Sequence, residues 1–65
     1  MKIQEVNERV RMIAEVAGDP RVAHIEEDRL YLEVLMAIAD GSRLSRDLAK
    51  AALRTQELSF PRWYE

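Results

Sequence analysis

The chain has 65 residues, with 12 acidic and 10 basic side chains, no cysteine and a formal net charge of −2. The lack of cysteine excludes disulfides and thiolate zinc sites, and the balanced charge excludes a protein whose whole surface binds nucleic acid or anionic membrane. A chain this short buries only about 60% of the surface that its unfolded form exposes. We therefore expect one domain, residues 1–65, that gains stability by forming a homodimer.

Glycine and proline interrupt three helical patterns, and no repeat or strand-like alternation occurs, so the sequence predicts an all-α fold. The first predicted helix covers about residues 3–17. Its apolar stripe recurs at helical spacing and consists of Ile3, Val6, Val10, Ile13, Ala14 and Ala17. Gly18 is expected to end this helix in a left-handed conformation.

The second predicted helix covers about residues 20–40 and is the long central helix of the fold. Asp19 and Pro20 are typical of a helix start, although a start near His24 fits the sequence equally well. Gly41 is expected to end the helix. Its apolar arc covers roughly two-thirds of the circumference, far more than a surface helix needs, so apolar surface should remain for a partner.

The third predicted helix covers about residues 44–57, with Ser42 or Ser45 as its cap. Its apolar side carries Leu44, Leu48, Ala51, Ala52 and Leu58. An ordered, non-helical tail, residues 58–65, follows. Pro61 sets its conformation, because proline disfavours the helical conformation for the residue before it.

Three polar residues, His24, Glu27 and Asp28, fall inside the apolar arc of the second helix and should point inward. Buried charges need partners, and an antiparallel third helix returns the chain end to this point. The sequence therefore predicts a structural polar cluster that anchors the tail, in which Thr55 also lies within reach. Its members are His24, Glu27, Asp28, Arg54, Arg62 and Trp63.

The same three residues also suggest a metal site, because helical di-metal carboxylate proteins place such ligands on one turn. No inward acidic residue of another helix completes a coordination shell, so we expect no metal and no other cofactor. Glu5 and Glu8 have the E-x-x-E spacing of all-α nucleotide pyrophosphatases but point away from the apolar stripe. Without a phosphate loop or an activated nucleophile, we expect no catalytic residues and no enzyme.

A basic face runs along the third helix at spacings of three and four residues, and we interpret it as a binding surface. It consists of Arg43, Arg46, Lys50 and Arg54. Ala37 and Gly41 have the spacing of a helix-turn-helix motif. However, the second helix is too long for that motif, and Asp47 occupies a position that should be apolar. Nucleic-acid binding therefore stays as the alternative to protein association.

Three motifs resemble a family of short proteins from actinobacteria and their phages. The motifs are A-H-x-x-E-D at Ala23–Asp28, L-A-x-x-A-L-x-T at Leu48–Thr55 and F-x-R-W at Phe60–Trp63. The resemblance covers the chain from about Ala14 onward, so the first 13 residues lie outside it. It implies a shared scaffold and origin, and it implies no particular chemistry.

Together these features predict a small, non-enzymatic protein that binds other proteins, with nucleic-acid binding as the alternative. We expect a homodimer formed through apolar surface on the second helix and through Met12, Val16 and Leu53. A phage-encoded modulator of a host protein would fit the resemblance. No signal peptide is apparent and no apolar run is long enough to span a membrane, so we expect a cytoplasmic protein.

Overall fold

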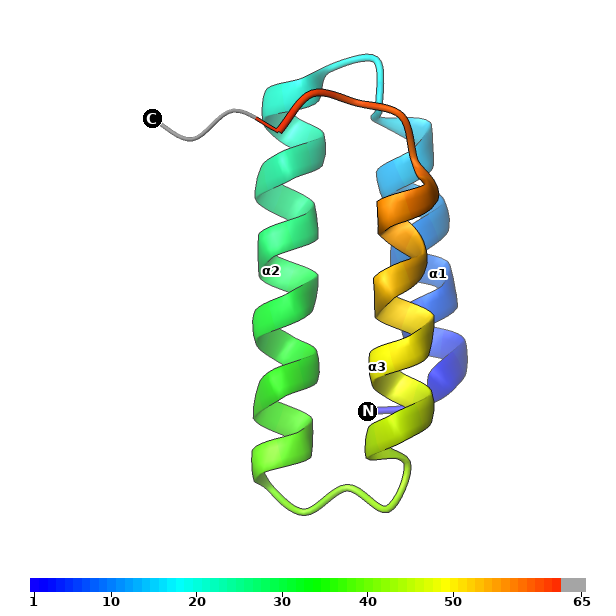
Figure 1. Ribbon diagram of the computed structural model, residues 1–65, viewed down its shortest axis with the longest axis vertical. Helices are drawn as coiled ribbons and strands as arrows, with labels where there is room; N and C mark the ends of the chain where they lie inside the picture. The colour runs from blue at the N-terminus through cyan, green and yellow to red at the C-terminus, as the bar shows by residue number, and fades with distance from the viewer. Residues whose placement is uncertain (63–65) are drawn as a thin grey trace.

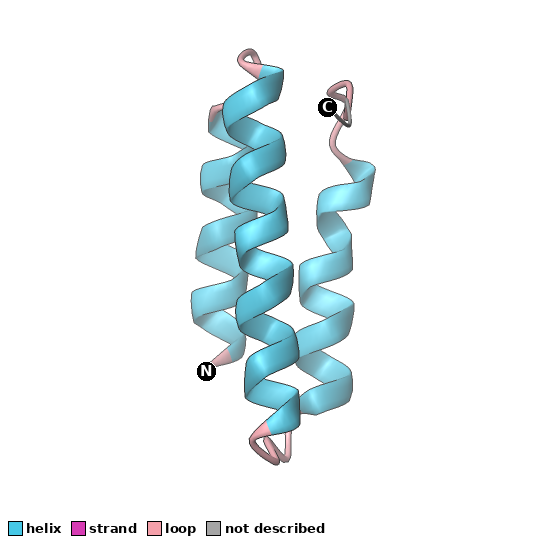
Figure 2. Cartoon of the chain, turned by 90° about the vertical axis from the view of Figure 1, so that its left-hand side faces the viewer, coloured by secondary structure: helices cyan, strands magenta, loops and turns pink. Residues whose placement is uncertain are grey.

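The computed structural model describes residues 1–62, which form three α-helices and no strand. The helices are α1 (Ile3–Glu15), α2 (Pro20–Ala39) and α3 (Ser45–Leu53), and a short 3₁₀ helix, η1 (Arg54–Glu57), continues α3. α1 and α3 run in the same direction and antiparallel to α2 (Figure 1). Viewed from the side of α2, α1 and α3 lie on either flank of it (Figure 2). The predicted all-α, three-helix fold is confirmed, with α2 as its longest helix.

The end of α1 differs from the sequence-based expectation. The helix ends at Glu15, and Val16 follows with a φ of −100°. Gly18 does not have a positive φ, so the prediction that it provides a left-handed stop is wrong. The turn is closed by the main chain, because the Asp19 N–H donates to the Val16 carbonyl at 2.9 Å. That hydrogen bond needs no left-handed residue.

α2 begins at Pro20, where the sequence left two starting points open. The Asp19 carboxylate accepts a hydrogen bond from the Val22 N–H at 3.4 Å, which satisfies one of the free donors of the first turn. Proline fits the first helical position because the missing N–H has no partner there in any case. At the other end, Gly41 stops the helix with a φ of +89°, as the sequence predicts.

The start of α3 corrects a second expectation. Leu44 occupies the capping position, and no side chain caps the helix. Ser45 is already helical, and the Ser42 hydroxyl accepts from the Leu44 N–H at 3.2 Å, within the turn. Neither serine is therefore the cap. The Ser42 oxygen lies too early in the chain to reach the free donors of the first helical turn. Its hydrogen bond stabilises the loop instead.

Each helix buries one narrow stripe in a shared core. The buried apolar side chains are Val6, Val10, Ile13, Ala23, Leu30, Val34, Leu48, Ala51, Ala52 and Phe60. Ala14 and Leu44, which the sequence places on apolar stripes, are exposed instead. α2 has only two neighbouring helices, so most of its wide apolar arc faces outward. Among the described residues, no helix is long and apolar enough to cross a membrane.

The two glycines provide a matched test of the backbone geometry. A Cβ atom added at either position would meet no atom within 4 Å, so only the backbone conformation separates them. Gly41→Ala forces a side chain into a left-handed conformation and should lower the free energy of unfolding by about 1–2 kcal/mol. Gly18→Ala avoids this strain and restricts the unfolded chain, so it should be neutral or stabilise by up to about 1 kcal/mol.

Denaturant titration of both variants measures these changes, provided that the slope with denaturant concentration stays the same. Equal losses for the two variants would contradict the difference in backbone conformation.

Candidate functional site

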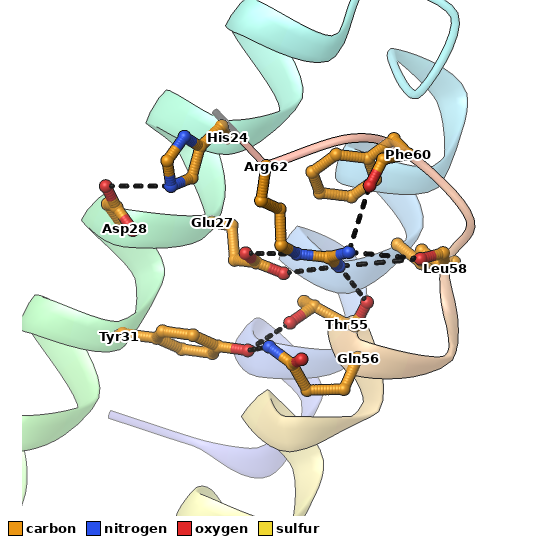
Figure 3. A network of polar contacts seen from close by, with 9 residues as sticks. All are labelled: His24, Glu27, Asp28, Tyr31, Thr55, Gln56, Leu58, Phe60 and Arg62. Atoms are coloured by element: carbon orange, nitrogen blue, oxygen red, sulfur yellow. Dashed lines mark hydrogen bonds and ion pairs between the residues drawn. The ribbon is translucent and has the colours of Figure 1, made fainter. Parts of the chain in front are cut away.

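A buried ion pair between Glu27 of α2 and Arg62 of the tail is the centre of the polar cluster (Figure 3). Arg62 Nε donates to Glu27 Oε1 at 2.8 Å, and Arg62 Nη2 donates to Oε2 at 2.9 Å. The Glu27 side chain is only 3% exposed, and that of Arg62 is 21% exposed. This two-point geometry satisfies both carboxylate oxygens, as a buried carboxylate requires.

Arg62 also holds the main chain around the end of η1. Its Nη2 donates to the Thr55 carbonyl at 2.8 Å, and its Nη1 donates to the Phe60 carbonyl at 3.1 Å. The Leu58 carbonyl lies 3.5 Å from both of these nitrogens. Helix C-termini leave carbonyls without partners and carry partial negative charge, so a guanidinium is a favourable partner. Its central carbon also lies 3.9 Å from the centre of the Phe60 ring.

A second polar link lies beside the ion pair and joins α2 to η1. Gln56 Nε2 donates to the Tyr31 hydroxyl at 2.7 Å, and the hydroxyls of Tyr31 and Thr55 are hydrogen-bonded to each other. Thr55 is fully buried and helps to lower the pKa of Glu27. A hydroxyl both donates and accepts, so the Tyr31 and Thr55 oxygens can satisfy each other at this point. The sequence pattern does not single out Tyr31 or Gln56, because Tyr31 falls among the apolar residues of α2 and resembles a core side chain.

The structure does not bring all predicted cluster members together. Asp28 is 66% exposed, so its predicted inward orientation is wrong; it pairs with His24, whose Nε2 lies 3.5 Å from its Oδ2. The buried stripe of α2 is narrower than its apolar arc, and Asp28 lies beyond that stripe. Arg54 is exposed, and none of the cluster's contacts within residues 1–62 involves it. Trp63 lies outside the described residues.

Burial would raise the pKa of Glu27, but the surrounding charges and donors outweigh it. The hydrogen bonds from Arg62 and Thr55, together with the positive charges of Arg62 and His24, hold that pKa below its ordinary value of 4.5. Glu27 is therefore ionised at neutral pH. The ion pair therefore stabilises the fold fully at pH values above 4.5, where Glu27 is ionised in the unfolded chain as well.

The arrangement is suited to joining chain segments. The polar atoms of Glu27 and Arg62 are used on each other, on Thr55 and on main-chain carbonyls. Within residues 1–62, no three histidine, aspartate or glutamate side chains are placed to hold a metal ion. The predicted basic face, Arg43, Arg46, Lys50 and Arg54, is exposed along its whole length.

Comparisons with protein-family models, with curated proteins and with solved structures each found no match.

Single replacements of Glu27 and Asp28 compare the contribution of the buried Glu27–Arg62 pair with that of the exposed Asp28 carboxylate. Glu27→Ala strands the Arg62 guanidinium and should lower the free energy of unfolding by about 3 kcal/mol or more. Asp28→Ala removes an exposed carboxylate and should change it by no more than about 0.5 kcal/mol. Thermal or urea unfolding measures both. Similar losses in the two variants would show that burial does not determine the importance of these carboxylates.

Acid should selectively remove the stability that Glu27 provides. Its pKa is lower in the folded protein, so this stability is fully present above the ordinary pKa of 4.5 and is lost as the pH falls through the folded-state pKa. Glu27→Gln cannot titrate at this position. The gap in unfolding free energy between wild type and Glu27→Gln should stay constant near neutral pH and shrink below pH 4.5. A gap that widens on acidification would contradict the sign of the pKa shift.

Proposed function

We propose that this chain is a small, non-enzymatic protein that acts by binding other protein surfaces. The observation that supports the proposal is the outward face of α2, defined here as Ile25, Leu32, Leu35 and Met36. These side chains are 49%, 59%, 63% and 57% exposed, respectively. Contiguous exposed apolar surface is unfavourable in water and is typical of interaction sites.

The surroundings of this face determine its extent. Met12 of α1 is 39% exposed and Leu53 of α3 is 58% exposed, so both remain available for association. Val16, which the sequence assigns to the same surface, instead packs against the core. Besides the outward face of α2, each neighbouring helix thus offers one exposed apolar side chain for association.

Self-association is the simplest form of this proposal. A homodimer formed through the outward face of α2 buries the exposed leucines of both copies and adds the stability that a chain of 65 residues needs. In line with the resemblance to actinobacterial and actinophage proteins, we propose that the chain acts in the host cytoplasm, as a phage-encoded modulator that docks on a host protein.

Sedimentation velocity tests the homodimer at tens of micromolar. Wild type should sediment as a dimer, and Leu32→Glu should shift it to the monomer, because two glutamates would then face each other in an apolar contact. Ala14→Glu is the matched control, since it places the same charge at an exposed position of α1 that lies outside the interface.

A wild-type chain that stays monomeric and still melts cooperatively would contradict the homodimer. Such a chain would tolerate its own exposed apolar face. Dissociation by Ala14→Glu and Leu32→Glu alike would show that the interface lies elsewhere.

Nucleic-acid binding is the second candidate, and one observation favours it. Arg43, Arg46, Lys50 and Arg54 are exposed, and within residues 1–62 none of them forms an ion pair. These cations follow one another from the turn before α3, along α3, to the start of η1, and such a row suits a phosphate backbone. This alternative requires that a labelled DNA duplex binds and that its affinity falls steeply as salt is added. Failure to bind at low salt eliminates it.

A further inference from the structure

An apolar groove lies between α2 and α3, on the α3 side of the outward face. Its volume is about 210 Å³. Its lining residues are Tyr31, Val34, Leu35, Ile38, Ala49, Ala52 and Leu53. The two leucines at its edges, Leu35 on α2 and Leu53 on α3, are 63% and 58% exposed. Such a groove, with small alanines along one wall and leucines at its edges, has the form that receives the apolar ridge of a helix.

Positive charge borders the α3 side of this groove. Arg46 and Lys50 precede Leu53 by seven and three residues, so all three side chains lie on the same side of α3. Both cations are exposed, and no ion pair within residues 1–62 involves either of them. The α2 side has no such row of cations, because the exposed Asp28 and Arg29 carry opposite charges and Glu33 pairs with Arg9 of α1. The groove is therefore apolar along its floor and basic along one edge.

We infer that this groove binds an amphipathic helix of a partner protein that carries acidic residues along one edge. The inference rests on the proposed function, and it names the chemistry of the partner. Apolar side chains of the partner at positions i, i+3, i+4 and i+7 enter the groove, as in other helix-in-groove complexes. Its glutamates or aspartates lie over α3 and pair with Arg46 and Lys50.

A second copy of the chain is a poorer match for the same groove. The exposed apolar helix face that a second copy can offer is the outward face of α2. The exposed charges within that face are one aspartate and one arginine, Asp28 and Arg29. Docked on α3, this face provides no acidic edge for the two cations. Charge complementarity thus favours a partner with a uniformly acidic edge.

Two synthetic helical peptides test the inference by fluorescence anisotropy with the full-length protein. Both present leucines at i, i+3, i+4 and i+7; one has glutamates along the edge of the leucine ridge, and the other has lysines at the same positions. The glutamate peptide should bind, more weakly as salt is added, and the lysine peptide should bind at least about tenfold more weakly. Equal binding of the two peptides would overturn the role of the basic edge.

Variants of the protein locate the bound peptide. The double change Arg46→Glu and Lys50→Glu should weaken binding of the glutamate peptide by about tenfold or more. Arg11→Glu with Arg21→Glu changes the net charge equally at exposed positions away from the groove, and it should change binding by less than about twofold. Leu53→Ser removes an apolar edge and should also weaken binding. Thermal melts of each variant show that the helices remain folded.

The remaining outcomes separate this inference from the proposed function. If Leu32→Glu abolishes the homodimer but leaves peptide binding intact, the groove binds the peptide independently of the dimer contact and the inference is supported. If Leu32→Glu abolishes both, the peptide binds the outward face of α2 and the inference fails. A homodimer without any peptide binding leaves the proposed function standing and overturns the groove. The protein could instead bind a DNA duplex and no peptide. If Arg46→Glu with Lys50→Glu abolishes that DNA binding, the basic edge belongs to a nucleic-acid site and the inference fails.

Discussion

A carboxylate inside a small helical core has to be neutralised, and the rest of the structure depends on how this is done. Glu27 lies in the buried stripe of α2, and Arg62 in the tail after η1 provides the compensating positive charge. The guanidinium simultaneously satisfies carbonyls at the end of η1 and in the tail. The Arg62 side chain thus satisfies the carbonyls at the helix end and neutralises the buried charge of Glu27. It also packs on the ring of Phe60, which is buried in the core.

The arrangement of the helices leaves one side of α2 free. The tail crosses from the end of η1 to the start of α2 (Figure 1). Phe60 in this tail is buried and belongs to the core. The rest of α2 has only α1 and α3 beside it, so Leu32 and Leu35 remain exposed. The polar cluster is therefore structural in our account. The proposed binding surfaces are the outward face of α2 and the groove next to it.

The sequence predicts the three helices because their apolar spacing and their punctuating residues agree, and it predicts a partner for Glu27 because a buried carboxylate requires a cation. It fails for Asp28 because the helical wheel assumes that the whole apolar arc is buried, whereas two neighbouring helices cover only a narrow stripe. It misses Tyr31 because a tyrosine has an apolar ring that fits a core as well as a polar hydroxyl. The need of that hydroxyl for a hydrogen-bond partner is the property that points to the contact.

A double-mutant cycle on the ion pair shows most directly whether Glu27 holds the tail through Arg62. Glu27→Ala, Arg62→Ala and the double variant are compared with wild type by urea unfolding, and the coupling energy is the departure from additivity. We expect a coupling of about 2 kcal/mol or more, because each single change strands the other charge next to the core. Additive losses, within about 0.5 kcal/mol, would show that Glu27 and Arg62 contribute independently and that the tail is held by something else.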